Sequence, residues 1–207
     1  MATVPKGHPE KPQGAHGTAL LERMNGGHHE ELALWGMSHL AIPEDGHALD
    51  IGCGGGANIE RLLARMPEGR VCGIDYSPLS VKVSREHNAL AIEQGRCAVL
   101  EGNASNIPFP DAAFDLVTAF ETTYYWDLPT AFAEVGRVLK PAGLFLVCNE
   151  DDGCNPETAE LAKQIPHMSV LTAEMLEGEL LTAGFSIVRT ERIPHKGYLA
   201  IVAQRKG

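Results

Sequence analysis

The segment Ala48-Leu49-Asp50-Ile51-Gly52-Cys53-Gly54-Gly55-Gly56-Ala57-Asn58 decides the fold of this chain. It begins as an apolar run with one carboxylate, which is typical of a buried strand, and continues into a glycine-rich turn ahead of a helix-like stretch. Glycine lets the backbone of such a turn approach a ligand where a side chain would collide. The segment therefore predicts a strand, a ligand-binding turn and a helix.

Short apolar runs alternate with amphipathic stretches after this segment, which predicts a mostly parallel sheet with helices on both faces. We predict strands at residues 48–51, 71–74, 97–100, 114–120 and 144–148, and helices near 59–66, 79–93 and 128–139. Residues 141–143 are expected to end the third helix and turn into the next strand. A helix at 172–183 and an antiparallel pair of strands at 185–190 and 198–204 complete the sheet.

The first 42 residues differ from the rest of the chain. Proline and glycine are frequent up to Gly17, which predicts a mobile arm. Residues 18–42 look helical, and Gly26 and Gly27 are expected to divide them into two helices. We expect residues 1–42 to form an arm and lid helices on the same domain as residues 43–207, because the length leaves little room for a second core.

Composition argues against several classes of protein. The net charge of −10 would repel nucleic acid, and no apolar run reaches the roughly 20 residues of a membrane-spanning helix. The N-terminus lacks the apolar stretch of a secretory signal, and the five cysteines include no CxxC pair. We expect a cytoplasmic monomer or homodimer that takes a small-molecule partner, without nucleic acid or membrane insertion.

Polar side chains follow the predicted strands at the sheet edge where ligands bind in open α/β folds. Asp75 ends the second strand, where a carboxylate can accept hydrogen bonds from a ribose, and Tyr76 follows it. Asn103 and Ala104 follow the third strand, and Glu121 follows the fourth. The glycine pattern alone also fits a dinucleotide, so a nicotinamide-dependent oxidoreductase is one alternative.

Four segments in this order resemble class I S-adenosylmethionine (SAM)-dependent methyltransferases, in particular the small-molecule group that includes the ubiquinone- and menaquinone-biosynthesis enzymes. They are Asp50–Gly56, Gly73–Asp75, Gly102–Val117 and Arg137–Gly143. The resemblance covers residues 42–184 and implies an α/β, Rossmann-like, doubly wound sheet of seven strands, mostly parallel with an antiparallel last strand. It implies methyl transfer from SAM to a small-molecule acceptor by in-line displacement, with S-adenosylhomocysteine as product.

The resemblance also implies roles for individual residues. The methionine part of SAM would contact the residues of the turn: Asp50, Gly52, Cys53, Gly54 and Gly56. Asp75 would bind the ribose, Asn103 and Ala104 would lie at the adenine, and the Phe120 carbonyl would bind the methionine amino group. From its place after Asp75, Tyr76 could lie against the adenine face, and an exposed loop residue is the alternative for it. Many relatives have aspartate in place of Asn103, whose carbonyl oxygen can still accept a hydrogen bond from adenine. A non-catalytic SAM-binding module is the second alternative.

The candidate catalytic residues are Glu121, Tyr125 and His28, which could take a proton from the acceptor or orient it. Ordinary packing is the alternative for Tyr125, as it is for Cys53, and a solvated histidine is the alternative for His28 and its neighbour His29. Six of the nine histidines fall in the first 47 residues, but their spacing fits no metal-binding motif, so no metal site is expected. Residues 151–166 are expected to form an extended loop beside the acceptor.

Overall fold

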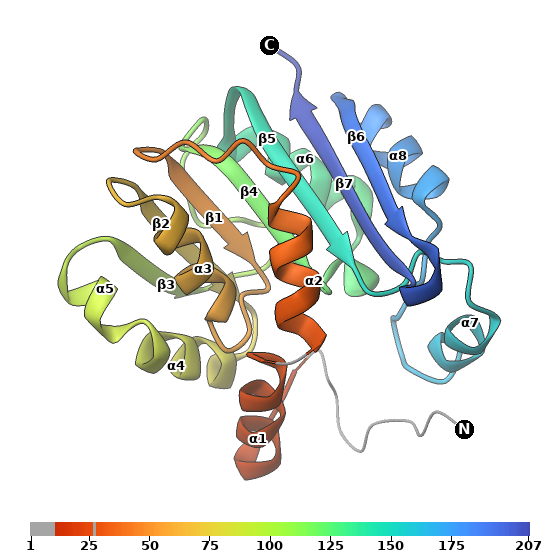
Figure 1. Cartoon of the computed structure of the whole chain (residues 1–207), viewed down its shortest axis with the longest axis horizontal. Coiled ribbons are helices and arrows are strands. Elements are labelled where there is room, and N and C mark those ends of the chain that lie inside the picture. The colour runs from red at the N-terminus through yellow and green to blue at the C-terminus, as the bar shows by residue number, and fades with distance from the viewer. Residues whose placement is uncertain (1–10, 27) are drawn as a thin grey trace.

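The structure is a computed structural model that describes residues 11–26 and 28–207. Its centre is a seven-stranded sheet in the order β3-β2-β1-β4-β5-β7-β6 (Figure 1). The strands are β1 (His47–Ile51), β2 (Arg70–Asp75), β3 (Cys97–Glu101), β4 (Phe114–Phe120), β5 (Leu139–Asn149), β6 (Phe185–Ile193) and β7 (Tyr198–Arg205). β7 pairs antiparallel with β5 and β6, and the other pairs are parallel. The predicted mostly parallel sheet with an antiparallel last strand is confirmed.

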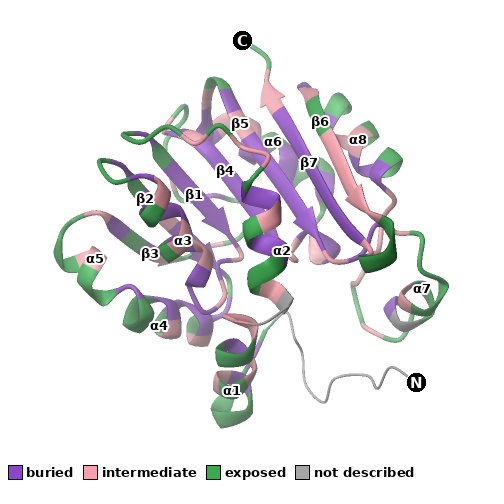
Figure 2. Ribbon diagram, viewed as in Figure 1, coloured by how far each residue is buried: buried purple, intermediate pink, exposed green. Residues whose placement is uncertain are grey.

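Helices cover both faces of this sheet (Figure 1). On one face lie α2 (His28–Met37), α3 (Ala57–Arg65), α4 (Pro78–His87) and the short α5 (Ala89–Glu93). On the other lie α6 (Leu128–Val138) and α8 (Ala173–Thr182). The central strands are buried between these two layers (Figure 2), which explains why their sequences read as nearly continuous apolar runs.

Two helix starts follow the capping chemistry of the sequence. The Ser77 hydroxyl accepts a 3.3 Å hydrogen bond from the backbone N–H of Ser80, and Pro78 occupies the first position of α4. The Thr172 hydroxyl caps α8 in the same way, accepting from the Met175 N–H at 3.3 Å. The observed starts of α4 and α8 thus lie within one residue of the predicted starts, and each start has a capping residue.

Two predicted boundaries were wrong. The single helix expected at 79–93 is divided into α4 and α5 at Asn88, because the buried side-chain amide of Asn88 donates to the carbonyls of Gly56 and Ser84, each at 3.0 Å. Residues 141–143 belong to β5, which begins at Leu139. The pairing register with β4 shifts there, and Ala142 has a φ of 64°, so a bulge takes up these residues.

The N-terminal region contains two helices, as predicted, but they have different surroundings. α1 (Gly14–Met24) begins inside the expected arm and packs against α4, while residues 1–10 and Gly27 lie outside the described part of the chain. Leu32, Ala33 and Met37 of α2 are fully buried in the core. α2 therefore belongs to the body of the domain, and α1 is the more peripheral helix.

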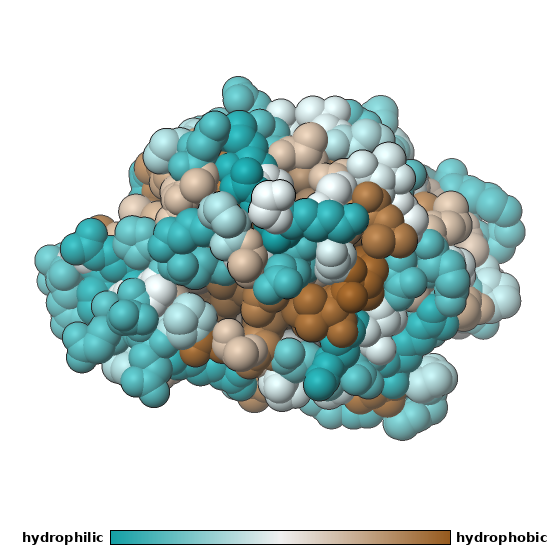
Figure 3. All heavy atoms as spheres, turned by 90° about the horizontal axis from the view of Figure 1, so that it is seen from above, coloured by the Kyte–Doolittle hydropathy of each residue, from teal (hydrophilic) through white to brown (hydrophobic). Residues whose placement is uncertain are grey.

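The outer surface is mostly hydrophilic on the face seen from above in Figure 3, where hydrophobic residues gather in a band near the middle. Within residues 11–26 and 28–207, no helix has the length and apolar character needed to cross a membrane. The loop expected at 151–166 contains a further helix, α7 (Pro156–Ala162).

Candidate functional site

The turn between β1 and α3 is built on three glycines with positive φ. Gly52, Gly54 and Gly56 have φ angles of 74°, 51° and 87°, in the left-handed region that other residues rarely adopt. The N–H of Gly52 donates to the Ile74 carbonyl at 2.8 Å, which fixes the turn to the neighbouring strand. A Cβ on Gly52 would lie 2.2 Å from Cγ2 of Thr122. Both backbone conformation and space therefore require glycine here.

A small cavity of about 60 Å³ opens beside this turn. It is enclosed by elements that are far apart in the sequence: the turn with the start of α3, the helices α1 and α2, and the end of β4. Its walls include Leu21, Met24, His29, Leu32, Phe120 and Glu121. The turn is thus covered by the N-terminal helices, as a ligand site shielded from solvent requires.

Asp50 lies near the end of β1 and is only 2% exposed, and it is not part of the cavity wall. Its carboxylate accepts a 2.7 Å hydrogen bond from the Thr118 hydroxyl. Burial raises the pKa of Asp50 to about 7, and the nearby carboxylate of Asp75 adds to that rise, while the Thr118 hydrogen bond opposes it. The structure therefore places Asp50 as a support behind the turn.

Asp75, at the end of β2, connects that strand to the glycine turn. One carboxylate oxygen accepts from the Gly54 N–H at 3.0 Å, and the other accepts from the Ser77 N–H at 2.8 Å. Burial raises the pKa of Asp75, and these backbone hydrogen bonds partly offset the effect. Tyr76 follows and is 37% exposed, and Lys11 Nζ lies 5.5 Å from the centroid of its ring in a cation–π contact.

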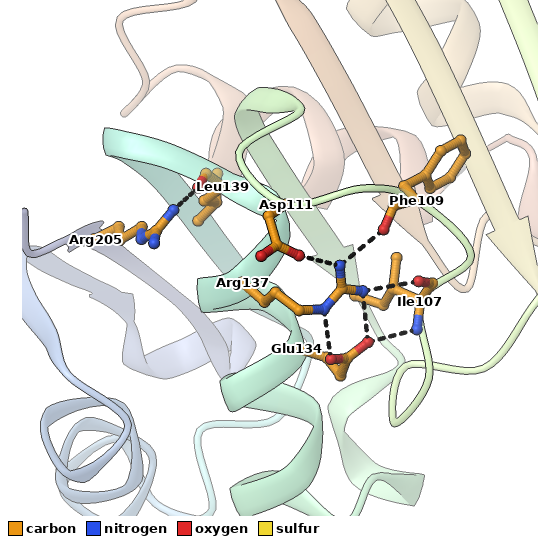
Figure 4. Close-up of polar contacts among 7 residues, drawn as sticks. All are labelled: Ile107, Phe109, Asp111, Glu134, Arg137, Leu139 and Arg205. Carbon is orange, nitrogen blue, oxygen red and sulfur yellow. Dashed lines mark hydrogen bonds and ion pairs between the residues drawn. The ribbon is translucent and has the colours of Figure 1, made fainter.

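Asn103 and Ala104 lie just beyond β3. The side-chain oxygen of the exposed Asn103 accepts from the Ser105 N–H at 2.9 Å, and Ala104 is buried in the core. The loop that carries them is fixed by Arg137 of α6, which donates to the carbonyls of Ile107 and Phe109 and pairs with Glu134 and Asp111 (Figure 4). Four of the predicted cofactor residues line the first cavity: Gly52, Cys53, Gly54 and Phe120. The other predicted cofactor residues lie outside its wall: Asp50, Gly56, Asp75, Tyr76, Asn103 and Ala104.

Cys53 packs as a small residue inside the turn. It is 6% exposed, and its Sγ lies 3.8 Å from the Ser84 hydroxyl. Burial raises the pKa of this thiol well above its usual value, which disfavours the reactive thiolate. This environment supports a packing role within the cavity wall.

Glu121 follows β4 in a left-handed conformation, with a φ of 60°. Its carboxylate accepts from the backbone N–H of Glu150 and, at 3.5 Å, from the Tyr124 hydroxyl. Burial raises the pKa of Glu121, and the nearby Glu150 adds to the effect. These contacts join the carboxyl ends of β4 and β5.

The aromatic run after β4 separates into three environments. Tyr124 lies next to Glu121, and its oxygen also accepts from the Asp151 N–H at 3.2 Å. The hydroxyl of Tyr125, the predicted candidate, is instead 3.8 Å from the sulfur of Met168. Trp126 packs edge-on against Phe132 of the core, with ring centroids 6.4 Å apart. Among these three aromatic residues, the geometry favours Tyr124 as the one beside the site.

A second, larger cavity of about 610 Å³ lies beyond β5, between α7 and the short 3₁₀ turn Pro194–Lys196. Tyr124 and the carboxylates of Glu150, Asp151 and Asp152 form one side of it. Arg192 and Lys196 form the other, and they are paired with Glu174 and Glu31. Charged groups of both signs therefore line this cavity, and its acidic groups directly follow β5.

Two further residues lie between the cavities: His29, which the sequence analysis named only beside His28, and Glu150, which it missed. His29 lines the first cavity, and one of its ring nitrogens lies within 4.8 Å of carboxylate oxygens of both Glu121 and Glu150. Glu150 follows β5 as Glu121 follows β4, so the strand-end rule applied to the fifth strand would have found it. The predicted His28 begins α2, and its side chain lies outside the described part of the structure.

Comparison with known proteins shows similarity to methyltransferases. Residues 49–147 match the family model described as a methyltransferase domain. The chain is 31% identical over 147 residues to an O-methyltransferase of Penicillium expansum, covering 69% of this chain and 52% of that one. It is 32% identical over 164 residues to a probable SAM-dependent methyltransferase of Mycolicibacterium smegmatis, covering 77% and 59%. The chain thus spans about half the length of these curated relatives.

Solved structures give the same fold. A methyltransferase solved with the Trm112 activator of Haloferax volcanii superposes with a TM-score of 0.83 at 20% identity, covering 91% of this chain and 95% of that one. A SAM-dependent methyltransferase of Aquifex aeolicus gives a TM-score of 0.73 at 20% identity, covering 90% and 97%. Together with the family match, they confirm the resemblance drawn from the sequence. Residues 49–147 of this chain are therefore similar to the methyltransferase domain family, and the relatives that match the chain include SAM-dependent enzymes.

Proposed function

We propose that this protein transfers a methyl group from SAM to a small-molecule acceptor, with the β1–α3 turn as the cofactor site. The main support for this proposal is the geometry of the turn. Its glycines have left-handed backbones at the carboxyl edge of parallel strands, and the turn lies within the segment that matches the methyltransferase family. Relatives named for small molecules support the acceptor class, among them an erythromycin 3''-O-methyltransferase of Saccharopolyspora erythraea and a demethylmenaquinone methyltransferase of Geobacillus kaustophilus.

The residues at the turn fit this cofactor. The glycines hold the turn in a left-handed backbone beside the cavity, and Leu21, Leu32 and Phe120 supply an apolar wall. Asp75 accepts one backbone hydrogen bond at each oxygen, and a carboxylate has further lone pairs for ribose hydroxyls. The small volume of the cavity implies that α1 shifts when the cofactor binds.

When bound, SAM supplies an electrophilic methyl group on a sulfonium. The chain's main contribution is then placement: α1 and α2 exclude water from the cavity, and the turn holds the donor in line with the acceptor. We assign the acceptor to the second cavity, because Glu121 lines the first, Glu150 lines the second, and their carboxylates meet. Glu121, Tyr125 and His28 stay predictions as proton-handling residues.

Titration calorimetry tests the cofactor assignment. Wild-type protein should bind SAM and S-adenosylhomocysteine but not NADH, and Asp75→Ala should weaken SAM binding at least tenfold. Ser77→Ala is the matched control, because it removes the cap of α4 and keeps the carboxylate. Absence of heat with SAM would refute the proposal.

Turnover separates an enzyme from a non-catalytic SAM-binding module. S-adenosylhomocysteine release should be measured across thiol, amine and phenol acceptors. Binding of SAM without release on any of them favours the binding module.

We further infer that α1 forms a lid over the site, and that the protein is a cytoplasmic monomer or homodimer that does not act on nucleic acid. The net charge of −10 supports the last point, and the place of α1 beside the cavity supports the first. Light scattering on the intact chain measures the oligomeric state.

A further inference from the structure

A histidine and two glutamates from three separate elements meet between the two cavities. His29 lies in the first turn of α2, Glu121 directly follows β4, and Glu150 directly follows β5. One potential ligand atom from each residue, a ring nitrogen or a carboxylate oxygen, lies within 4.8 Å of the other two. The three side chains therefore surround a common point between the cofactor cavity and the acceptor cavity.

The backbone around these residues is held by buried structure. The N–H of Glu150 donates to the Glu121 carboxylate, and Tyr124 bridges Glu121 and the Asp151 N–H. On the other side, Leu32 and Ala33 are 1% exposed and fix the first turns of α2 against the sheet. The cluster is thus formed by the ends of two core strands and a core helix.

The donor set suits a metal ion. Two carboxylates this close repel each other, and a cation between them relieves the repulsion. One imidazole nitrogen with two carboxylate oxygens suits borderline divalent ions such as Mn²⁺, Fe²⁺ or Zn²⁺. Sites with three protein ligands keep a position open for water or substrate.

We propose that His29, Glu121 and Glu150 bind a divalent transition-metal ion at the junction of the two cavities. The open coordination position would take an oxygen of the acceptor and lower the pKa of an acceptor hydroxyl. This role toward the acceptor rests on the proposed methyl transfer, whereas metal binding itself does not. The site departs from the sequence-based expectation of no metal, because the three residues come together only in the fold.

Mn²⁺ titration followed by electron paramagnetic resonance tests the site on the full chain. One tight Mn²⁺ per chain is expected, with a nitrogen coupling in the pulsed spectrum from the imidazole of His29. Glu150→Gln should weaken Mn²⁺ binding at least tenfold, and His29→Gln should abolish the nitrogen coupling. The matched control is Asp152→Asn, a neighbouring residue of the second cavity whose side-chain oxygen can still accept from the Cys154 N–H.

The alternative is a hydrogen-bonded cluster of His29 and the two glutamates without a metal ion, and it predicts no tight Mn²⁺ site. Absence of binding at millimolar Mn²⁺, or equal binding by wild type and Glu150→Gln, overturns the proposal. Circular dichroism and SAM calorimetry on each variant confirm folding. Intact SAM binding without Mn²⁺ binding refutes the metal site alone, and the reverse result refutes the proposed cofactor site alone.

Discussion

The Thr118 hydroxyl donates a 2.7 Å hydrogen bond to the Asp50 carboxylate across two directly paired strands, β4 and β1. Both residues are almost completely buried, at 0% and 2% exposure. Burial raises the pKa of Asp50 from an ordinary 3.8 to about 7, because the charged form loses its water and one hydrogen bond replaces it only in part. Between about pH 4 and pH 7, Asp50 therefore carries a proton in the folded protein but not in the unfolded chain.

Asp50→Asn should stabilise the protein at high pH and weaken SAM binding. Between pH 4 and 7 the folded state binds the extra proton, so the stability that depends on this group falls as pH rises, and the penalty is complete above about pH 7. Removing the carboxylate should increase the free energy of unfolding at pH 8 by up to about 3 kcal/mol, and less at pH 5. Urea unfolding at both pH values measures this. Exposed Asp45→Asn is the control, and equal gains at both pH values would contradict the assignment.

Gly54→Ala and Gly95→Ala form a matched pair for the cofactor turn. Both glycines have left-handed backbones, with φ of 51° and 71°, and a Cβ on either would meet no atom closer than 3.8 Å. Each variant should lose about 1 kcal/mol of stability from backbone strain. Only Gly54→Ala should also lose SAM affinity in calorimetry. Unchanged affinity in Gly54→Ala would place the cofactor elsewhere.

Deleting residues 1–25 should weaken SAM binding without unfolding the domain, because α2 and its core contacts remain. Asn25 at the end of α1 donates to the Gly55 carbonyl at 3.2 Å and accepts from Arg61 at 2.7 Å, which fixes α1 over the turn. Asn25→Ala should therefore speed SAM dissociation severalfold in stopped-flow experiments. Thr18→Ala, whose hydroxyl bonds within α1, is the control. SAM kinetics that match wild type in both the deletion and Asn25→Ala would refute a lid role for α1.

Arg137→Lys should lower stability by about 2 kcal/mol, because lysine cannot reproduce hydrogen bonds at five donors. The guanidinium donates to Glu134 at 2.7 and 2.8 Å, to Asp111 at 2.9 Å, and to two carbonyls of the loop after β3 (Figure 4). Arg189→Lys, with an exposed partner 3.9 Å away, should change little. Thermal unfolding compares the two, and equal effects would show that the loop does not depend on Arg137.

The sequence predicted elements whose signals are local. Alternating apolar runs predicted the strands, and the helix starts predicted at residues 79 and 172 lie within one residue of the observed starts of α4 and α8. The helix break at Asn88 could not be predicted, because it depends on a hydrogen bond to Gly56, which is 32 residues away. The bulge at the start of β5 was missed for a similar reason, since it depends on how Leu139 pairs with β4.

The residues of the candidate site also separate into those with a local sequence signal and those that depend on tertiary packing. The strand-end rule led to Asp75, Asn103 and Glu121, which do lie at one edge of the sheet. His29 reaches Glu121 and Glu150 only because α2 packs across β5, and the periodicity of α2 contains no signal for that position.

The close contact between α2 and β5 has a consequence for cofactor exchange. A Cβ on Gly36 would lie 2.6 Å from the sulfur of Cys148, so the helix backbone rests directly on the strand. A helix seated this tightly cannot swing outward without exposing Leu32 and Met37 to water. We therefore expect SAM and S-adenosylhomocysteine to pass beside α1, and the anchoring of α1 to set how fast they exchange.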